Sequence, residues 1–432
     1  MAHIAEFAVA SEDIATRSRV DSIDAAAHAI EAQVIAWRRD IHQHPELGNR
    51  EFRTAGIVAE HLRRLGFDEV RTGVAVTGVV GLLKGALPGP VVALRADMDG
   101  LPVTEEVDVP FASKVRATWN GESVGVMHAC GHDAHVAILM GVASVLAGLR
   151  SSLRGTVKFI FQPAEEMPPE GEEGGAKLMV EQGVLDNPRP VAIFGLHVTH
   201  RLPCGVIGYR PGPTMASSDR LKITVHGRQT HGAAPWMGVD PIVTAAQVVL
   251  GLQTVVSRQI DITREPAVVT IGTIKGGVRE NIIPDSVEMR GTIRSFDEAM
   301  RDEIHERVTY LAEHISRGSR AGCTVCITKN YPVTVNDPEL TAAMAPTLRR
   351  VAGDARLRLI NKVSGSEDFS FFQKVVPGMF FFLGVTPEGT DPAKSASNHS
   401  PRFFIDEKAL VTGVRALAHL SCDRLAAGSD RQ

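Results

Sequence analysis

The sequence predicts an α/β protein in which a mostly parallel sheet, covered by helices on both faces, is interrupted by an inserted smaller domain. Near-continuous apolar runs alternate with helical stretches along most of the chain, as in parallel sheets that are buried on both sides. A middle segment instead shows the order β-α-β-β-α-β, which is typical of a ferredoxin-like domain. Proline-rich sequences, PGPTM and NYPVTVNDP, border this segment and indicate two joints.

The elements of the larger domain follow from hydrophobic spacing. Apolar residues recur at helical spacing from Ile23 to Trp37, which predicts the first helix. The expected strands are 79–85, 91–97, 156–162 and 191–197, and the expected helices are 21–43, 53–65, 132–150, 174–182, 338–352 and 406–425. Because the middle segment separates these elements, we expect one discontinuous domain, formed by residues 21–212 and 330–432.

The inserted domain is expected to span residues 213–329. Its first strand, DRLKITVHG, alternates polar and apolar residues, which predicts a sheet with one exposed face. The expected strands are 219–227, 267–277, 286–296 and 323–331, and the expected helices are 240–260 and 297–318. Acidic residues near the N-terminus interrupt the apolar core that a secretory signal needs. Residues 1–20 are therefore expected to be a polar, disordered leader instead.

Composition excludes several classes of partner. The chain has 432 residues, 44% of them hydrophobic and 22% charged, with a net charge of −4. This composition is that of a soluble globular protein and gives no reason to expect nucleic acid as a partner. No apolar run approaches the roughly 20 residues that cross a bilayer, so no membrane partner is expected.

The cysteines predict a reducing compartment. There are five, an odd and sparse set, which argues against a disulfide framework and for a cytoplasmic location. Cys323 and Cys326 form a CxxC within a β-rich run, where residues three apart point to opposite faces of a sheet. Because no second CxxC completes a zinc site, we do not expect a metal there.

Metal-binding residue types follow the predicted apolar strands, where open α/β sheets place their ligand sites. In MHACGHDAH, Cys130 and His132 form a C-x-H pattern. Residues two apart in an extended segment face the same way, so thiolate and imidazole could hold one metal ion. The pattern alone is weak, because a buried cysteine beside a loop histidine is commonplace.

Two further strands end near ionisable side chains. PAEE follows strand 156–162, and consecutive residues at a strand end point to opposite sides. One of Glu165 and Glu166 could therefore bind metal while the other acts as a general base, although two adjacent carboxylates are usually a solvated turn. His197 ends strand 191–197, and His399 lies in the polar loop SASNHSPRF. Taken singly, these histidines would be a satisfied core residue and an ordinary loop residue.

Together these residues supply enough ligands for two metal ions and leave Glu165 as the base. The ligand set is Cys130, His132, Glu166, His197 and His399. Asp99 is expected to orient the metal site from behind the ligands, with Asp97 beside it. A thiolate favours a softer ion such as zinc, whereas imidazole and carboxylate also suit manganese, cobalt or nickel, so the sequence does not select the metal.

Five segments closely resemble the hippurate hydrolase and indole-acetyl-amino-acid hydrolase family: LRADMDGLP, MHACGHDAH, FQPAEE, GLHV and NHSPRF. That family belongs to the co-catalytic metallohydrolases, which include aminoacylases and carboxypeptidase-like enzymes. The resemblance covers nearly the whole chain from Arg38 to Phe404. It implies two divalent metal ions per subunit on the five ligands named above, Glu165 as the catalytic base, and an inserted lid domain used for dimer contact.

The resemblance also assigns residues of the lid. In GRQTHGAAP, His231 would reach an active site across the dimer and polarise the scissile carbonyl. Asn281 and Arg294 would contact the carboxylate of the substrate. By themselves, His231 would be a hydrogen-bonded turn residue and Arg294 a solvated strand cation. The sequence MPPEGEE, residues 167–173, departs from the family pattern and places an additional loop directly after Glu166.

The expected activity is metal-dependent hydrolysis of N-acyl amino acids, either hippurate-like or N-acetylated, to a free acid and an amino acid. The expected protein is a homodimer or higher homo-oligomer. A dipeptidase or carboxypeptidase and an N-acetyl-diaminopimelate deacetylase are alternatives on the same site. A metal-free cysteine amidase using Cys130 with His132 or His135 would leave the remaining proposed ligands unexplained. A non-catalytic binding protein would predict missing ligands, whereas all are present.

Overall fold

The computed structural model describes residues 17–427, and the chain divides into two compact units. The larger unit comprises Met1–Gly212, Asn336–Ile360 and Phe371–Gln432, and the smaller unit, called the lid below, comprises Pro213–Val335 and Asn361–Ser370. Of the predicted leader, residues 1–16 lie outside the described residues, while residues 17–20 already belong to a helix that runs to residue 29. No helix within residues 17–427 has the length and apolar character that crossing a bilayer requires.

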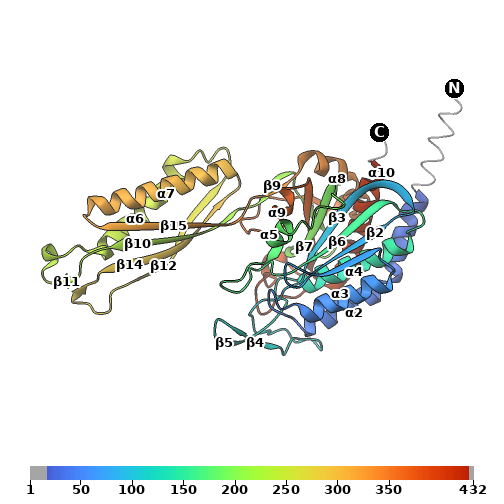
Figure 1. Ribbon diagram of the computed structural model, residues 1–432, viewed down its shortest axis with the longest axis horizontal. Helices are drawn as coiled ribbons and strands as arrows, with labels where there is room; N and C mark the ends of the chain where they lie inside the picture. Colours follow the sequence, from blue (N-terminus) through green and yellow to red (C-terminus); the bar gives the residue numbers. More distant parts are fainter. Residues whose placement is uncertain (1–16, 428–432) are drawn as a thin grey trace, which may run out of the picture. The chain divides into compact units, whose positions relative to one another are not determined.

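The larger unit is built on an eight-stranded sheet with the order β1-β2-β6-β3-β7-β18-β8-β17 (Figure 1). Strands β6, β3, β7 and β18 are parallel to one another, which confirms the predicted mostly parallel sheet. The bounds are β1 Glu69–Val74, β2 Gly78–Lys84, β3 Leu87–Asp97, β6 Arg154–Gln162, β7 Ala192–Pro203, β8 Ile207–Tyr209, β17 Leu357–Leu359 and β18 Gly378–Thr386.

Helices and connecting segments cover both faces of this sheet. On one face, Phe159 and Phe161 of β6 belong to the same core as residues of the helices α2, α4 and α10. Lys158 directly precedes Phe159 in the strand and therefore points to the other face. Its Nζ donates there to the carbonyls of Val184 and Asp186, both at 2.8 Å. The helices of this unit are α2 Glu31–Gln43, α3 Phe52–Arg64, α4 His132–Gly148, α5 Gly175–Glu181, α8 Pro338–Ala352, α9 Ser370–Gln373 and α10 Leu410–Ala427.

Helix α4 is the central helix of the larger unit. Nearly all of its residues are buried, so the helix is apolar on every side, as expected for a helix without a solvent face. It packs against α2, α10 and β3. This packing holds the first residue of the helix, His132, at a defined position at the carboxyl end of the parallel strands.

The lid consists of a four-stranded antiparallel sheet, in the order β12-β14-β10-β15, and two helices (Figure 1). Its elements are β10 Ser218–His226, α6 Pro241–Thr254, β12 Ala267–Gly276, β14 Ser286–Ser295, α7 Glu298–Gly318 and β15 Gly322–Tyr331. This is the predicted βαββαβ order, so the ferredoxin-like class is confirmed. Leu221, Ile223 and Val225 alternate with exposed residues along β10, which gives the sheet one covered face and one exposed face.

Several elements differ from the expectations. The predicted helix 240–260 is α6 followed by a π-helix, Val255–Gln259, and the predicted helix 21–43 is interrupted at residue 30. Strand β18 is buried throughout but was not identified from the sequence. The short strands are β4 Arg116–Trp119, β5 Glu122–Gly125, β9 Gly212–Met215, β11 Thr230–His231, β13 Ile282–Ile283 and β16 Thr334–Asn336. The lid also includes Asn361–Ser370, which we expected in the larger domain.

A buried ion-pair network joins β10 to α7 in the lid. Asp219 is fully buried, and its carboxylate accepts hydrogen bonds from the guanidinium of Arg301 and from His305 Nε2 at 2.7 Å. Burial raises the pKa of Asp219, but the hydrogen bonds from His305 and Arg301 outweigh it and hold the pKa below its ordinary value. The charged carboxylate is therefore stabilised by its two partners.

We predict that Arg301→Ala destabilises the lid by about 3–5 kcal/mol, because it leaves the Asp219 carboxylate buried without its main partner. The loss is measured as the change in the free energy of unfolding in urea. Arg307→Ala is the matched control, since Arg307 forms only an exposed pair with Glu303 on the same helix and should cost less than about 0.5 kcal/mol. Equal losses in both variants would contradict the role of the network.

Candidate metal centre

Metal-binding side chains from four separate segments of the larger unit converge in one cluster. Three groups formed by the predicted residues alone have their donor atoms within 4.8 Å of one another. These groups are Cys130–His132–His197, Cys130–Glu166–His399 and His132–Glu165–Glu166. They overlap through shared members, so the structure brings all five predicted ligands and the predicted base together.

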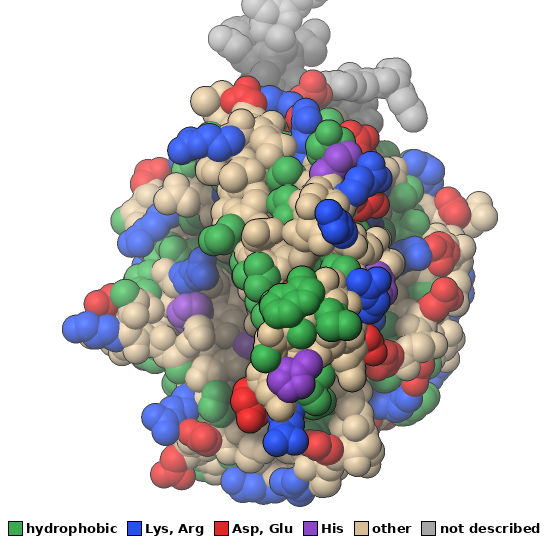
Figure 2. All heavy atoms as spheres, turned by 90° about the vertical axis from the view of Figure 1, so that its left-hand side faces the viewer, with side chains coloured by type: hydrophobic (Ala, Val, Ile, Leu, Met, Phe, Trp, Pro, Cys, Tyr) green, Lys and Arg blue, Asp and Glu red, His purple; other side chains and the backbone are tan. Residues whose placement is uncertain are grey.

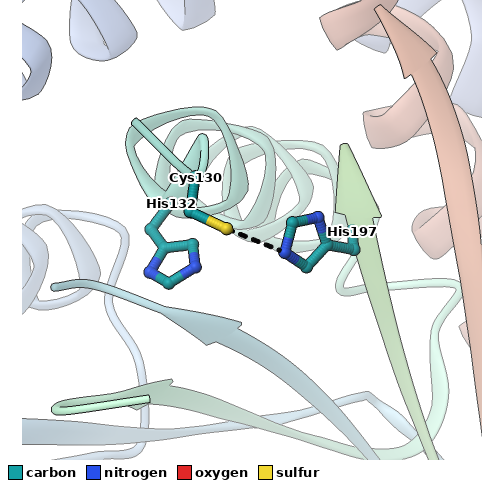
Figure 3. Close-up of side chains that lie close together, drawn as sticks. All are labelled: Cys130, His132 and His197. Carbon is teal, nitrogen blue, oxygen red and sulfur yellow. Dashed lines mark hydrogen bonds between the residues drawn. The ribbon is translucent and has the colours of Figure 1, made fainter. Parts of the chain in front are cut away.

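Cys130 and His132 converge for a reason that differs from the one expected. They do not lie in an extended segment: Cys130 is in a turn, and His132 is the first residue of α4 (Figure 3). Between them, Gly131 is the N-cap with a left-handed φ of 89°. A Cβ at Gly131 would come within 2.3 Å of Val198 Cγ2. Both the backbone conformation and the lack of space therefore require glycine here.

His197 presents Nε2 to the cluster. It lies within β7 rather than at its end, because the strand continues to Pro203. Its Nδ1 donates to the carbonyl of Val198 at 2.7 Å, and its Nε2 lies 3.4 Å from Cys130 Sγ (Figure 3). Burial, followed by the neighbouring His135, holds the pKa of His197 well below its ordinary value. The ring is thus neutral, with its lone pair on Nε2, the form that binds metals.

His399 enters the cluster from a loop near the C-terminus. Its Nε2 lies 3.2 Å from Cys130 Sγ and 2.9 Å from Glu166 Oε1. The preceding Asn398 fastens the loop, since its Nδ2 donates to the carbonyls of Cys130 and Val198, both at 3.1 Å. Asn398 was not identified from the sequence, and a hydrogen-bonding residue beside a loop histidine gives no signal on its own.

Glu165 and Glu166 lie in a turn, not at the end of a strand as predicted, because β6 ends at Gln162. The carboxylate of Asp99 accepts hydrogen bonds from the backbone N–H groups of Glu165 at 3.1 Å and Glu166 at 2.9 Å. The turn therefore directs the two glutamates, and Asp99 holds the turn. The Glu165 residue is only 6% exposed.

Asp99 also orients His132. Its Oδ1 lies 3.2 Å from His132 Nδ1, which leaves Nε2 of the ring directed to the cluster. This Nε2 is buried and has no hydrogen-bond partner within residues 17–427. A buried ring nitrogen in this state has a lone pair or a proton to satisfy, and a metal cation would satisfy the lone pair.

His135 lies close to the cluster but has both ring nitrogens occupied. Its Nδ1 is 2.5 Å from Asp97 Oδ1, and its Nε2 accepts the N–H of Val198 at 2.9 Å. Arg95 Nη1 donates to the second oxygen of Asp97 at 2.7 Å. His135 therefore supports the cluster rather than offering a free nitrogen to it. The sequence gives one indication that His135 lies near the cluster: it follows His132 by three residues on the same helix, so the two side chains share a face.

The electrostatics of the cluster favour a bound cation. Burial lowers the pKa of His132, but the carboxylates of Asp97 and Asp99 outweigh it and raise the pKa to about 10. Burial, followed by Glu166 and Glu165, raises the pKa of the Cys130 thiol well above its usual range. The carboxylates thus stabilise positive charge at the cluster, and the sulfur, imidazole and carboxylate donors match those of transition-metal sites.

The lid residues named from the sequence lie in two places. His231 is exposed in β11 and accepts the N–H of Ala233 on Nδ1 at 3.0 Å. Asn281 is its neighbour, because the carbonyl of Asn281 accepts the N–H of Gly232 at 2.8 Å. Arg294 lies in β14, where it is half-buried and its Nη1 donates to Ser366 Oγ at 2.9 Å.

Comparison with known proteins gives the family. The model of "Peptidase family M20/M25/M40" matches residues 93–423, which include every residue of the cluster. The chain belongs to this family. The resemblance inferred from the five sequence segments is thereby confirmed, and the chain is a metal-dependent amidohydrolase.

Individual relatives cover almost the whole chain. Thermostable carboxypeptidase 2 of Saccharolobus solfataricus is 44% identical over 392 residues, which is 90% of this chain and 94% of that protein. N-acetylcysteine deacetylase of Bacillus subtilis is 38% identical over 399 residues, 91% of this chain and 97% of that protein. The Bacillus subtilis YXEP protein, described as a dinuclear metal-binding peptidase of the M20 family, is 35% identical with a TM-score of 0.76 over 92% of this chain and 99% of that chain.

We predict that Cys130 is a poor nucleophile once metal has been removed with a chelator. Because its thiol pKa is raised, alkylation by iodoacetamide should stay slow at pH 7–8 and accelerate only above the ordinary cysteine pKa of about 8.5. Mass spectrometry of the labelled peptides measures this, with the exposed Cys326 as the internal comparison. Rapid labelling of Cys130 at pH 7, with activity that resists the chelator, would favour a cysteine amidase.

Proposed function

We propose that this protein hydrolyses the amide bond of N-acyl amino acids, hippurate-like or N-acetylated, with two divalent metal ions per subunit. The observation that carries the proposal is the convergence of sulfur, imidazole and carboxylate donors around a buried ring nitrogen, His132 Nε2, that has no hydrogen-bond partner within residues 17–427. Family membership and the deacetylase relative support the reaction class, and the YXEP protein supports a pair of metals.

The proposed ligands gather around the sulfur of Cys130. Its Sγ lies 3.4 Å from His197 Nε2 and 3.2 Å from His399 Nε2, and His132 and Glu166 complete the set that would hold the ions. When bound, the two ions would supply Lewis-acid activation of a water molecule and of the amide carbonyl. The thiolate favours zinc, while manganese, cobalt and nickel also suit the other donors.

Glu165 is the proposed proton carrier. Its carboxylate lies 4.0 Å from His132 Nε2, beside the proposed ligands. The backbone N–H of Glu165 itself donates a hydrogen bond to Asp99, which fixes the position of the residue. It would take a proton from the attacking water and deliver it to the departing amine. A carboxylate beside the ligands is suited to both steps, because the same oxygen can accept a proton and then return it.

The lid is proposed to bind and polarise the substrate. His231 would stabilise the negative charge that develops on the carbonyl oxygen. Arg294 and Asn281 would hold the substrate carboxylate. A guanidinium suits this role because its hydrogen bonds to a carboxylate are charge-assisted and can be bidentate. Support comes from the resemblance of the lid segments and from the half-buried position of Arg294, which sets it apart from a solvated surface cation.

The second candidate is a carboxypeptidase or dipeptidase. A peptide with a free C-terminus is also an acylated amino acid, so the same centre could cleave it. The carboxypeptidase relative, 44% identical, supports this candidate, and N-acetyl-diaminopimelate deacetylation is a further variant of the same chemistry. The metal-free cysteine amidase is disfavoured because His135 has both nitrogens occupied and the Cys130 thiol pKa is raised.

We further propose a homodimer, or a higher oligomer, formed through the lid. Large apolar side chains of the lid are exposed, with Trp236 at 79%, Met237 at 66% and Val278 at 96%. Figure 2 looks onto the side of the molecule where β11 lies in Figure 1 and shows hydrophobic side chains gathered there. Exposed apolar patches of this kind mark protein interfaces. The five free cysteines support a cytoplasmic location.

The test of the proposed function combines a substrate panel with two glutamate variants. Metal-loaded parent protein should release the amino acid from N-benzoyl, N-acetyl or peptidyl amino acids, and product analysis distinguishes these classes. Glu165→Gln should keep both metals and lose about 100-fold or more in kcat. Glu166→Gln should lower the metal content in elemental analysis. Near-parent kcat in metal-loaded Glu165→Gln would refute its role, and a parent inactive on the whole panel would refute the function.

If His231 acts across the dimer, two inactive variants should complement each other. His231→Ala and Glu165→Gln, mixed and refolded together, would form heterodimers that contain one complete site. Such mixtures should regain up to about a quarter of the parent activity, the share of complete sites expected from random pairing in a C2 dimer. Each variant refolded alone is the control. A fully active monomer in sedimentation analysis would contradict the arrangement.

A further inference from the structure

The turn that carries Glu165 and Glu166 has an unfavourable backbone. Ala164 has a φ of 51° and Met167 a φ of 83°, both in the left-handed region. Residues with a Cβ rarely adopt this region, because the Cβ approaches the neighbouring carbonyl oxygen. Two such residues within four positions mean that contacts from elsewhere in the fold must hold the turn.

Two buried carboxyl groups supply these contacts. Glu51 Oε1 accepts the N–H of Ala164 at 2.8 Å, and Asp99 accepts the next two N–H groups, those of Glu165 and Glu166. Three successive amides of the turn thus donate to carboxyl oxygens. The second oxygen of Glu51 accepts the hydroxyl of Thr77 at 2.5 Å, so both of its oxygens have defined partners.

The segment that carries Glu51 lies directly against the turn. Glu51 is 0% exposed, and three residues before it Gly48 approaches so closely that a Cβ there would lie 3.2 Å from Ala164 Cα. Burial, together with the charge of Asp99, raises the pKa of Glu51 to about 8. A neutral carboxyl group keeps an oxygen that accepts a hydrogen bond, as does the amide of glutamine.

We propose that Glu51 is a positioning residue for the hydrolytic reaction: it holds the Ala164 amide and thereby aims Glu165 and Glu166. The inference rests on the proposed function of these two glutamates. The Glu51 carboxyl group acts through the backbone of Ala164 and accepts its other hydrogen bond from Thr77, whereas Asp99 contacts the proposed ligands and the base directly. Its loss should therefore misplace the glutamates without removing a ligand.

The test compares Glu51→Ala with Glu51→Gln. In Glu51→Ala, hydrogen–deuterium exchange of a peptide covering residues 163–167 should become faster, and kcat should fall by about 10- to 100-fold through misplacement of the reacting groups. KM should change much less than kcat. Glu51→Gln should restore slow exchange and bring kcat to within about threefold of the parent, because the amide oxygen can accept the same N–H.

Glu46→Ala is the matched control. Glu46 lies in the same segment, and its carboxylate accepts the backbone N–H groups of Arg53 and Thr54, both at 2.9 Å, at the start of α3. Its loss should lower the Tm, because the two amides at the start of α3 lose their acceptor. It should leave kcat and the exchange of residues 163–167 unchanged, because α3 carries no residue of the cluster.

Two results would overturn the proposal: parent-like kcat and exchange in folded Glu51→Ala, or a glutamine variant as impaired as the alanine variant. A general structural role would lower kcat in Glu46→Ala as well, which would also count against it. If the parent hydrolyses no substrate of the panel, the proposed function fails. The exchange data then still decide whether Glu51 holds the turn, so the two failures are distinguishable.

Discussion

The arrangement of the candidate metal centre depends on the hydrogen bonds that the carboxylate of Asp99 accepts. One side chain accepts the amides of Glu165 and Glu166 and lies 3.2 Å from His132 Nδ1. Asp99 therefore connects the turn after β6 to the start of α4, and each of these two segments carries different donors of the cluster. Because Asp99 is almost fully buried, water does not compete for these hydrogen bonds, and their geometry is maintained by the core.

The surrounding fold keeps this carboxylate in place. Asp99 follows β3, the strand between β6 and β7 at the centre of the sheet, while α4 packs on β3 with almost no solvent face. Parallel strands bring their carboxyl ends to one edge, so the segments after β3, β6 and within β7 meet there.

The residues of the cluster could be named from the sequence, but the reasons given for their convergence were partly wrong. Cys130 and His132 meet across a left-handed glycine at a helix start, not along an extended segment. Glu165 and Glu166 lie in a turn rather than at a strand end, and both reach the cluster. Motifs identify residue types and spacing, whereas the backbone conformation between them depends on contacts with distant segments, such as the packing of Gly131 against Val198.

The sequence by itself determined the alternation of strands and helices, the ferredoxin-like order of the lid and which residues gather in the cluster, because these depend on local periodicity and motif spacing. Only the tertiary structure decided which nitrogen of His197 faces the cluster, why His135 is not free, and that Glu51 holds Ala164, 113 residues away. The physical reason is that each of these depends on a hydrogen bond formed by the backbone of a particular residue. Such a partner is set by the path of the folded chain and leaves no pattern in the sequence.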